Sequence, residues 1–391
     1  MPRSCKQSGR VSAVAARMAT VAILLAATIF TGSARGAGDS MQKQLDALFS
    51  AVTMPGDPGL AVIVRSHGKT IFERGYGVRD LKSGAKIDGV TNFRLASVTK
   101  EFTAMCVMAL VREKKLRYDE TLLEVFPDFP AYGKTVTIRS VLNHTSGLMP
   151  YEEILEKQYP NTPMEQIPQI KDAGVLEMMK QQTTTKFQPG TKWEYSNSGY
   201  AVLAMVIEKV SGKPFGSFLR KRIFAPLKMS NTIAYEKGKN EVVNRAYGHT
   251  KKGEAFEQTD QSPTSAVLGD GGIYSSVEDM AKWDGAIQNH TLISEQDMQP
   301  ALQPALMRPG SQDNPPTDER GNKIMYGFGW FLDPYNGHPR MYHDGSTIGF
   351  LTTNQLYTRD QLHIVILCNR LDIEPQALGQ KAADIVFAAQ K

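Results

Sequence analysis

Near its start the sequence gathers apolar and β-branched residues into two short runs. Residues 59–65 (GLAVIVR) and 70–76 (TIFERGY) flank the four residues 66–69, which predicts a β-hairpin. The same kind of pattern returns late in the sequence, in the runs 327–332, 340–343, 348–357 and 362–368. At most seven residues separate one of these later runs from the next, too few for a helical crossover. The sheet is therefore expected to be largely antiparallel.

Before, between and after these runs the pattern is typical of helices. Residues 41–52 are amphipathic with a helical period, and residues 102–111 are so apolar that they predict a buried helix. Further helices are expected at 138–143, 200–210, 214–223, 277–288 and 376–389. Ser276 and Asp279 resemble a capping box at the start of the helix over 277–288. Residues 304–323 are polar and Pro-rich, which predicts a surface loop.

Strands at both ends with helices between them predict an α+β fold in which the two ends of the chain contribute to one sheet. Residues 38–95 together with 291–391 are expected to form this discontinuous sheet domain, flanked by the terminal helices. Residues 96–290 are expected to form an inserted, mostly helical domain.

Composition and charge exclude several classes of protein. The chain has 391 residues, 41% of them hydrophobic and 22% charged, which excludes collagen-like, coiled-coil and mostly disordered proteins. The net charge of +5 comes from residues 1–37, which hold five basic residues and no acidic one. The remainder is neutral, with 40 residues of each sign. Without a concentrated basic field, we expect neither a nucleic-acid nor an anionic-membrane partner.

Residues 1–37 resemble a secretory signal peptide, because basic residues up to Arg17 precede an apolar run over 18–30 and a stretch of small residues. An apolar run of 13 residues is short for a membrane span, which needs about 20. We therefore expect a secreted or periplasmic protein, with an uncleaved N-terminal anchor as the alternative. The two cysteines beyond this leader, Cys106 and Cys368, lie in apolar surroundings and are expected to be buried thiols rather than a disulfide.

Several kinds of chemistry lack their motifs. There is no G-x-S-x-G elbow, which argues against an α/β-hydrolase. No H-E-x-x-H motif, close Cys/His cluster or EF-hand loop supports a metal site. No Walker loop or G-x-G-x-x-G motif indicates a nucleotide. We expect neither a metal nor another cofactor.

The string S-x-x-K occurs four times, at Ser40–Lys43, Ser66–Lys69, Ser83–Lys86 and Ser97–Lys100. Only the last is followed by a long apolar helix. At the start of that helix the free N–H groups and the dipole favour an oxyanion at Ser97. Lys100 lies one turn further on the same face, and burial disfavours its ammonium form, so it can accept the serine proton. The alternative is that Ser97 is an N-cap and Lys100 is solvated.

A second candidate element is Tyr195-Ser196-Asn197, directly before an apolar helix. Tyr195 can relay a proton between the nucleophile and a leaving group, and Asn197 can orient Lys100 or a substrate amide. The alternative is an aromatic packing residue and a capping Asn.

The third candidate element is His343-Asp344-Gly345-Ser346, between β-rich runs. Gly345 would let a substrate backbone approach closely. The N–H of Ser346 can then join that of Ser97 as a second oxyanion donor. The alternative is that His343 is a structural strand residue.

Taken in this order, S-x-x-K, Y-x-N and H-x-G resemble the motifs of the penicillin-recognising serine hydrolases. The resemblance is nearest to the class C β-lactamase-like group, which includes DD-carboxypeptidases, D-aminopeptidases and esterases. It runs from about residue 59 to 369, and further matching stretches lie at 93–100 (FRLASVTK), 142–148 (LNHTSGL), 190–200 and 269–283.

The resemblance implies an antiparallel sheet flanked by terminal helices, a helical domain, and a site at their junction. It implies roles for the matching residues: Ser97 as acylating nucleophile, Lys100 and Tyr195 as base and proton relay, Asn197 in positioning substrate, and His343 and Gly345 on the strand that borders the substrate. Three other residues of matching stretches are expected to be structural: His144, Gly147 and Asp270.

The third motif departs from many β-lactamases of the family, which have Lys where this chain has His343. An imidazole is mostly neutral near pH 7, which weakens the grip on a β-lactam carboxylate. Strand alternation should direct Asp344 to the opposite face. We therefore expect a secreted serine hydrolase acting on a small-molecule or peptide ester or amide, of the esterase, D-aminopeptidase or DD-carboxypeptidase type. A β-lactamase proper and a penicillin-binding sensor or scaffold without turnover are the alternatives.

Overall fold

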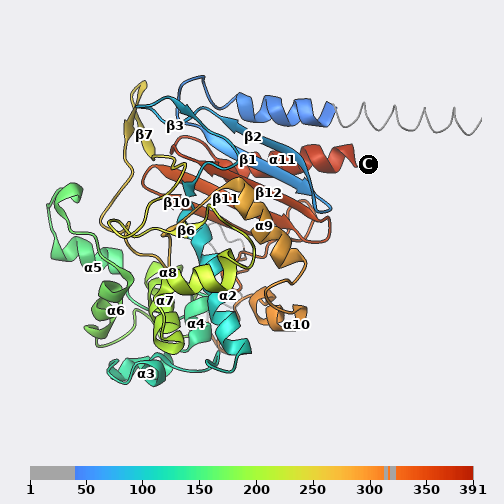
Figure 1. Ribbon diagram of the computed structural model, residues 1–391. Helices are drawn as coiled ribbons and strands as arrows, with labels where there is room; N and C mark the ends of the chain where they lie inside the picture. Colours follow the sequence, from blue (N-terminus) through green and yellow to red (C-terminus); the bar gives the residue numbers. More distant parts are fainter. Residues whose placement is uncertain (1–39, 312–315, 318–322, 391) are drawn as a thin grey trace, which may run out of the picture.

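The computed structural model describes residues 40–311, 316–317 and 323–390. The predicted leader, residues 1–37, lies outside them. A helix over residues 40–50 opens the described part, and the next elements lead to a five-stranded antiparallel sheet in the order β10-β11-β12-β1-β2 (Figure 1). Its strands are β1 (Leu60–Ser66), β2 (Lys69–Tyr76), β10 (Arg340–Thr347), β11 (Phe350–Tyr357) and β12 (Leu362–Cys368). Two segments about 300 residues apart therefore pair at its centre, with Leu60 opposite Cys368.

The central strands bury both faces of the sheet, as their continuous apolar runs require. Along β1, Leu60, Val62 and Val64 belong to one apolar core, whereas Ala61 and Ile63 belong to the other, because successive side chains alternate between faces. The first core is closed by the helix over 40–50 and by α11 (Pro375–Ala389). The second is closed by α9 (Val277–Gln288) and is continuous with the helical region.

The helical region is built around α2 (Thr99–Arg112) and α7 (Asn197–Ser211), which pack against each other. Most residues of both helices are buried, which follows from apolar residues on nearly every side. The other helices are α3 (Leu122–Val125), α4 (Ile138–Leu142), α5 (Tyr151–Gln158), α6 (Asp172–Lys180), α8 (Phe215–Leu219) and α10 (Glu295–Met298). Short helical turns are η1 (Ala96–Val98), η2 (Ala131–Thr135), η3 (Met164–Gln166), η4 (Arg220–Phe224) and η5 (Gln299–Leu302).

Seven short strands complete the described part. They form the ladders β3 (Val78–Asp80) with β4 (Ala85–Lys86), β5 (Phe93–Arg94) and β6 (Ile233–Ala234) on either side of β9 (Ile273–Ser275), and β7 (His249–Lys252) with β8 (Ala255–Gln258). Each is at most four residues long, and no sequence pattern distinguished them from loops.

The predicted hairpin, the long helices, the closing helix and the antiparallel sheet are confirmed, so the fold class is α+β as expected. Residues 327–332 are not a strand, which corrects the prediction. Only isolated bridges form there, at Tyr326 and Phe331, and Gly329 has a φ of 83° that interrupts an extended conformation. Both Cys106 and Cys368 are buried free thiols, as expected.

Only half of the predicted capping box forms at the start of α9. The Ser276 hydroxyl accepts from the N–H of Asp279, but the Asp279 carboxylate binds Asn231 and Thr232 instead of returning to the cap.

The helix α9 was grouped with the helical part, yet it packs on β1 and β12 (Figure 1). The division of the chain at residues 95 and 290 remains a prediction. No described helix combines the length and apolarity that a membrane crossing needs.

Candidate active site

The turn η1 brings Ser97 to the junction between the sheet and the helical region. Neither η1 nor α2 has a side-chain cap, so Ser97 is not an N-cap. The Lys100 Nζ instead lies within hydrogen-bond distance of the Ser97 Oγ, at 3.1 Å, and Lys100 is 0% exposed. The alternative of a capping serine and a solvated lysine is therefore excluded.

Lys100 has two further partners, and both are oxygens that can only accept. Its Nζ lies 2.8 Å from the Asn197 Oδ1 and 3.0 Å from the backbone oxygen of Asp270. Burial lowers the pKa of Lys100 to about 8, while the carboxylates of Asp270 and Glu152 raise it. At pH 7 about a tenth of an amine with this pKa is neutral, against fewer than about one in a thousand for an exposed lysine.

A hydrogen-bonded chain fixes the amide of Asn197. Its Nδ2 donates to the Glu152 Oε1 at 2.8 Å, so its oxygen must face Lys100. Asn197 is the first residue of α7, and the Ser196 side chain caps that helix. Of the two roles considered for Asn197, the geometry is that of orienting Lys100.

Two residues beside Lys100 were not identified from the sequence as part of the site. Glu152 lies in α5 and belongs to no motif. Asp270 was expected to be structural, but its carbonyl accepts from Lys100, and its carboxylate accepts from the Tyr151 hydroxyl at 2.9 Å. The Gly-rich stretch around Asp270 was a usable signal, since a loop of that kind lets backbone oxygens approach a side chain closely.

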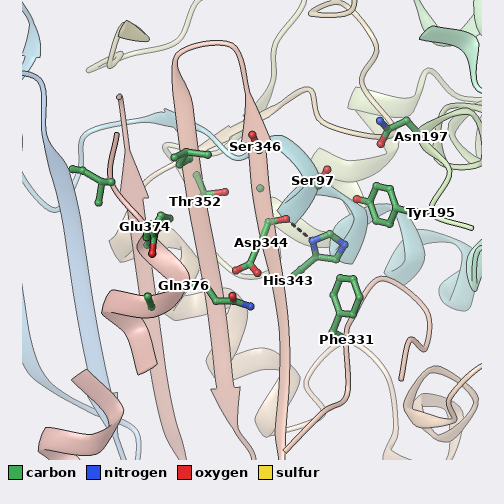
Figure 2. A pocket seen from close by; sticks show the side chains of 15 residues that line it. Ser97, Tyr195, Asn197, Phe331, His343, Asp344, Ser346, Thr352, Glu374 and Gln376 are labelled. Atoms are coloured by element: carbon green, nitrogen blue, oxygen red, sulfur yellow. Dashed lines mark hydrogen bonds between the residues drawn. The ribbon is translucent and has the colours of Figure 1, made fainter. Parts of the chain in front are cut away.

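Tyr195 lies between Lys100 and the cleft. Its ring centroid is 4.8 Å from the Lys100 Nζ, and its hydroxyl faces Ser97 (Figure 2) without a well-formed hydrogen bond to any described residue. Burial raises the pKa of Tyr195 well above its usual value, although contact with the Ser97 hydroxyl lowers it. The phenol is therefore protonated at neutral pH and can donate.

His144 holds the segment that carries Tyr195. Its Nδ1 accepts from the N–H of Ser196 at 3.0 Å, its backbone oxygen accepts from Glu194 at 2.9 Å, and its ring lies 4.4 Å from that of Tyr195. His144 is buried, and burial keeps its pKa well below the usual value, so it is neutral. Gly147 has a φ of 68°, and a Cβ there would lie 2.4 Å from the Phe187 oxygen. These contacts are structural, as expected for His144 and Gly147.

On the sheet side, β10 borders the cleft as the edge strand. Burial, with a smaller effect of Lys100, lowers the pKa of His343 to about 3, so the imidazole is neutral. Its Nδ1 is 2.6 Å from the backbone oxygen of Asp344 and its Nε2 is 3.1 Å from the Tyr326 hydroxyl. His343 therefore supplies no positive charge to the cleft.

Gly345 is needed for packing, which differs from the reason expected. A Cβ at this position would lie 2.2 Å from the Thr352 Oγ1 and 2.3 Å from the Leu95 oxygen. Those two atoms are joined by a 2.8 Å hydrogen bond that ties β11 to the start of η1. Directly beyond, Ala96 has a φ of 48°, an uncommon left-handed conformation for a residue with a side chain. The glycine thus lets the sheet edge press against the turn that presents Ser97.

The N–H of Ser346 lies on the outer edge of β10. Phe331 exchanges two backbone hydrogen bonds with Tyr342 on that edge. Because backbone groups of every second residue face the same side of an antiparallel strand, the N–H of Ser346 also points away from β11. Ser346 and Ser97 line the same cleft (Figure 2).

The cleft has a volume of about 560 Å³ and wraps around the edge strand. His343 and Asp344 point to opposite faces of β10, as predicted, and both line it (Figure 2). Its lining residues are Ser97, Tyr195, Asn197, Phe331, His343, Asp344, Gly345, Ser346, Leu351, Thr352, Ile373, Glu374, Pro375, Gln376 and Ala377. The described residues contain no group of three or more His, Cys, Asp or Glu side chains placed to hold a metal ion.

Comparisons with known proteins agree with the family resemblance. Penicillin-binding protein 4* of Bacillus subtilis is 27% identical over 362 residues, which are 89% of this chain and 76% of the relative. The fold is similar to that of D-amino acid amidase from Ochrobactrum anthropi, with a TM-score of 0.74 and 22% identity over 91% of this chain and 100% of the other. It is also similar to an octameric penicillin-binding protein homologue from Pyrococcus abyssi, with a TM-score of 0.72 and 22% identity over 90% of this chain and 77% of the other.

The model of one protein family, described as Beta-lactamase, matches residues 45–388. The match spans both ends of the sheet and the whole helical region, including all three motifs. The chain belongs to the Beta-lactamase family.

Proposed function

We propose that this protein is a serine hydrolase that cleaves an ester or amide through an acyl-enzyme on Ser97. The observation that carries the proposal is the placement of a fully buried lysine amine 3.1 Å from the Ser97 Oγ. The family includes D-amino acid amidase-like hydrolases as well as penicillin-binding proteins, which is consistent with acyl transfer.

The partners of Lys100 decide where its lone pair points. A neutral amine has two N–H groups and one lone pair. The Asn197 Oδ1 and the Asp270 oxygen can only accept, so they take the two N–H groups. The lone pair is then directed at the Ser97 hydroxyl, the one partner of the three that can donate. This geometry supports Lys100 as the general base.

In the acylation step, the Ser97 Oγ attacks the substrate carbonyl carbon and its proton passes to the Lys100 Nζ. The bond between the carbonyl carbon and the leaving nitrogen or oxygen then breaks, and the leaving atom receives a proton from the Tyr195 hydroxyl, which is replenished from Lys100. Water hydrolyses the resulting ester and frees Ser97. The N–H groups of Ser97 and Ser346 stabilise the negative oxygen in both halves of the reaction, a contribution on the order of 10²–10³ in rate for one donor.

The cleft supports a neutral or amine-bearing substrate over a β-lactam. A β-lactam carries a carboxylate, and the cleft lining contains no Lys or Arg among the described residues. His343 is neutral and two lining residues are acidic. We therefore favour an esterase or D-aminopeptidase over a β-lactamase proper, and also over a DD-carboxypeptidase, because the substrate of a carboxypeptidase likewise carries a carboxylate. Residues 1–37 support secretion or a periplasmic location.

The purified protein should be incubated with a fluorophosphonate and with benzylpenicillin, and its intact mass followed over time. We expect a stable phosphonyl adduct that Ser97→Ala abolishes and Ser66→Ala retains. The protein is then screened on p-nitrophenyl esters, D-amino-acid anilides, D-Ala-D-Ala peptides and nitrocefin. Turnover of an ester or amide is the expected result, rapid nitrocefin hydrolysis would identify a β-lactamase, and a permanent penicillin adduct without turnover would identify a sensor. Phosphonylation that persists in Ser97→Ala would refute the assignment of the nucleophile.

A further inference from the structure

The cleft continues past the edge strand into a second lobe, on the face of β10 opposite His343. Asp344 projects into this lobe, and Glu374 and Gln376 line it from the start of α11 (Figure 2). Leu351 and Ile373 give it apolar walls. The lobe therefore pairs carboxylates with an apolar surface in the same cleft as Ser97.

One oxygen of the Asp344 carboxyl lacks a partner, while the Thr353 side chain contacts the carboxyl. Its Oδ1 is shielded from solvent and forms no hydrogen bond with any described residue. Burial raises the pKa of Asp344 to about 6, although Thr353 and Arg340 lower it. The Arg340 guanidinium forms no hydrogen bond with Asp344. Its Nη2 donates to the Asp333 carboxylate at 2.8 Å, its Nε and Nη1 have no partner among the described residues, and its carbon lies 3.9 Å from the centre of the Tyr342 ring. A buried carboxyl oxygen without a donor is costly, so a ligand that donates to it gains affinity.

The balance of charge in the lobe is negative. The start of α11 contributes a partial positive charge of about +0.5. Asp344 and Glu374 together contribute up to two negative charges, and Glu374 is exposed at the mouth of the lobe. Arg340 and Asp333 also act on Asp344, but they form an ion pair and their charges are opposite. Two carboxylates then outweigh one helix terminus, so the lobe repels a substrate carboxylate and attracts an ammonium group.

We propose that the lobe between Asp344 and Glu374 binds an ammonium group of the substrate. The substrate class is an ester or amide with a primary amine within a few bonds of the scissile carbonyl, such as a free α-amine or a diamino-acid side chain. The apolar walls contact the carbon chain that links the amine to the carbonyl. This inference rests on the proposed hydrolase function and adds the chemistry of recognition to it.

The test uses three p-nitroanilide or p-nitrophenyl substrates that differ at one terminal group: ammonium, hydroxyl or carboxylate. We expect kcat/KM to be at least tenfold higher for the ammonium than for the hydroxyl compound, and lowest for the carboxylate. Asp344→Asn should reduce the ammonium-to-hydroxyl ratio to about two or less. Glu374→Gln should reduce it by a smaller factor because its charge is exposed. Glu254→Gln removes an exposed carboxylate outside the cleft and should leave the ratio unchanged.

A second measurement needs no variant. Butylammonium should inhibit the wild-type enzyme competitively at concentrations at least tenfold below those needed for butanol or butyrate. An unchanged ratio in Asp344→Asn, equal inhibition by the three additives, or preference for the carboxylate substrate would overturn the ammonium site. The fluorophosphonate reaction of Ser97 reports the hydrolase machinery separately. If labelling persists while the ammonium preference is absent, the lobe assignment fails and the proposed function stands.

Discussion

The same four-residue string occupies two very different places in this molecule. Ser66 is the last residue of β1 and Lys69 is the first of β2, on either side of a hairpin turn. There the lysine is exposed, and the Ser66 hydroxyl contacts His67 and Gln390. Ser97 and Lys100 begin a buried helix, where the lysine is fully enclosed and contacts the serine. The string alone therefore specifies no chemistry.

The difference comes from distant parts of the chain. The acceptors that enclose Lys100 lie 97 and 170 residues further along the sequence, in α7 and in the Gly-rich loop before β9. None of these partners reaches Lys69. A reactive amine here is a product of tertiary packing, which removes water and supplies acceptors in fixed directions.

Replacing each serine by alanine is the strongest test of the difference between the two sites. Ser97→Ala should reduce kcat on the best ester or amide by about 10⁴-fold or more, because the covalent route is lost. Ser66→Ala should keep kcat within about twofold, since its contacts are at the hairpin. Steady-state kinetics on both variants decide the matter. Comparable losses at the two serines would contradict the assignment.

The next largest effect is expected at the lysines. Lys100→Met keeps the length of the side chain but removes the base, and should lower kcat by about 10²–10⁴-fold. Lys69→Met changes an exposed side chain and should have little effect. Circular dichroism and thermal melting of each variant serve as the folding control. A fully active Lys100→Met would leave the reaction without its proposed base.

The pH profile sharpens the comparison further. With the neutral amine as the proposed base, the acylation rate should rise as pH increases through about 8, the pKa to which burial lowers Lys100, and then level off. Asn197→Asp places a carboxylate against the ammonium, which should raise that pKa by about one unit or more and cut the rate at pH 7 roughly tenfold. Asn289→Asp adds the same charge at an exposed site and should leave the profile in place. A profile that Asn197→Asp does not move would separate Lys100 from the observed titration.

The smallest expected effect is at two glycines, Gly345 beside the turn that carries Ser97 and Gly68 in the β1–β2 hairpin. Gly345→Ala forces a methyl group against the Thr352 and Leu95 oxygens, and should lower the free energy of unfolding by about 1–3 kcal/mol and also reduce kcat. Gly68→Ala, in the hairpin with a φ of 75° and open space around it, should cost about 1 kcal/mol and leave kcat unchanged. Urea unfolding and steady-state assays measure both quantities. Equal losses of activity would show that Gly345 does not support the Ser97 turn.

Much of the fold was predictable because its long elements have strong local patterns. The β-branched apolar run of β1 and the apolar residues of α2 and α7 indicated their structures directly. Short strands such as β9 were not predictable, because three residues are fixed by neighbours from distant parts of the chain. The run 327–332 failed as a strand because its glycines permit a turn that apolar content alone does not reveal.

The candidate site was predictable as a set of motifs but not as a network. The sequence indicated Ser97, Lys100 and Asn197, and the structure brings these three together. It gave no sign of Glu152, because a single carboxylate 45 residues from Asn197 acquires meaning only when the two helices meet. Nor could it show that the second face of β10 opens into the cleft, because that depends on the strand lying at the edge of the sheet.

The pairing of β1 with β12 has a consequence for how the molecule is made. During synthesis the β1–β2 hairpin emerges first, and one side of β1 must wait for a partner encoded about 300 residues later. Until then it offers an unpaired apolar edge that other chains can join. Ser346 is made equally late, so an emerging chain carries the proposed nucleophile before the proposed second oxyanion donor. Such high contact order predicts slow folding.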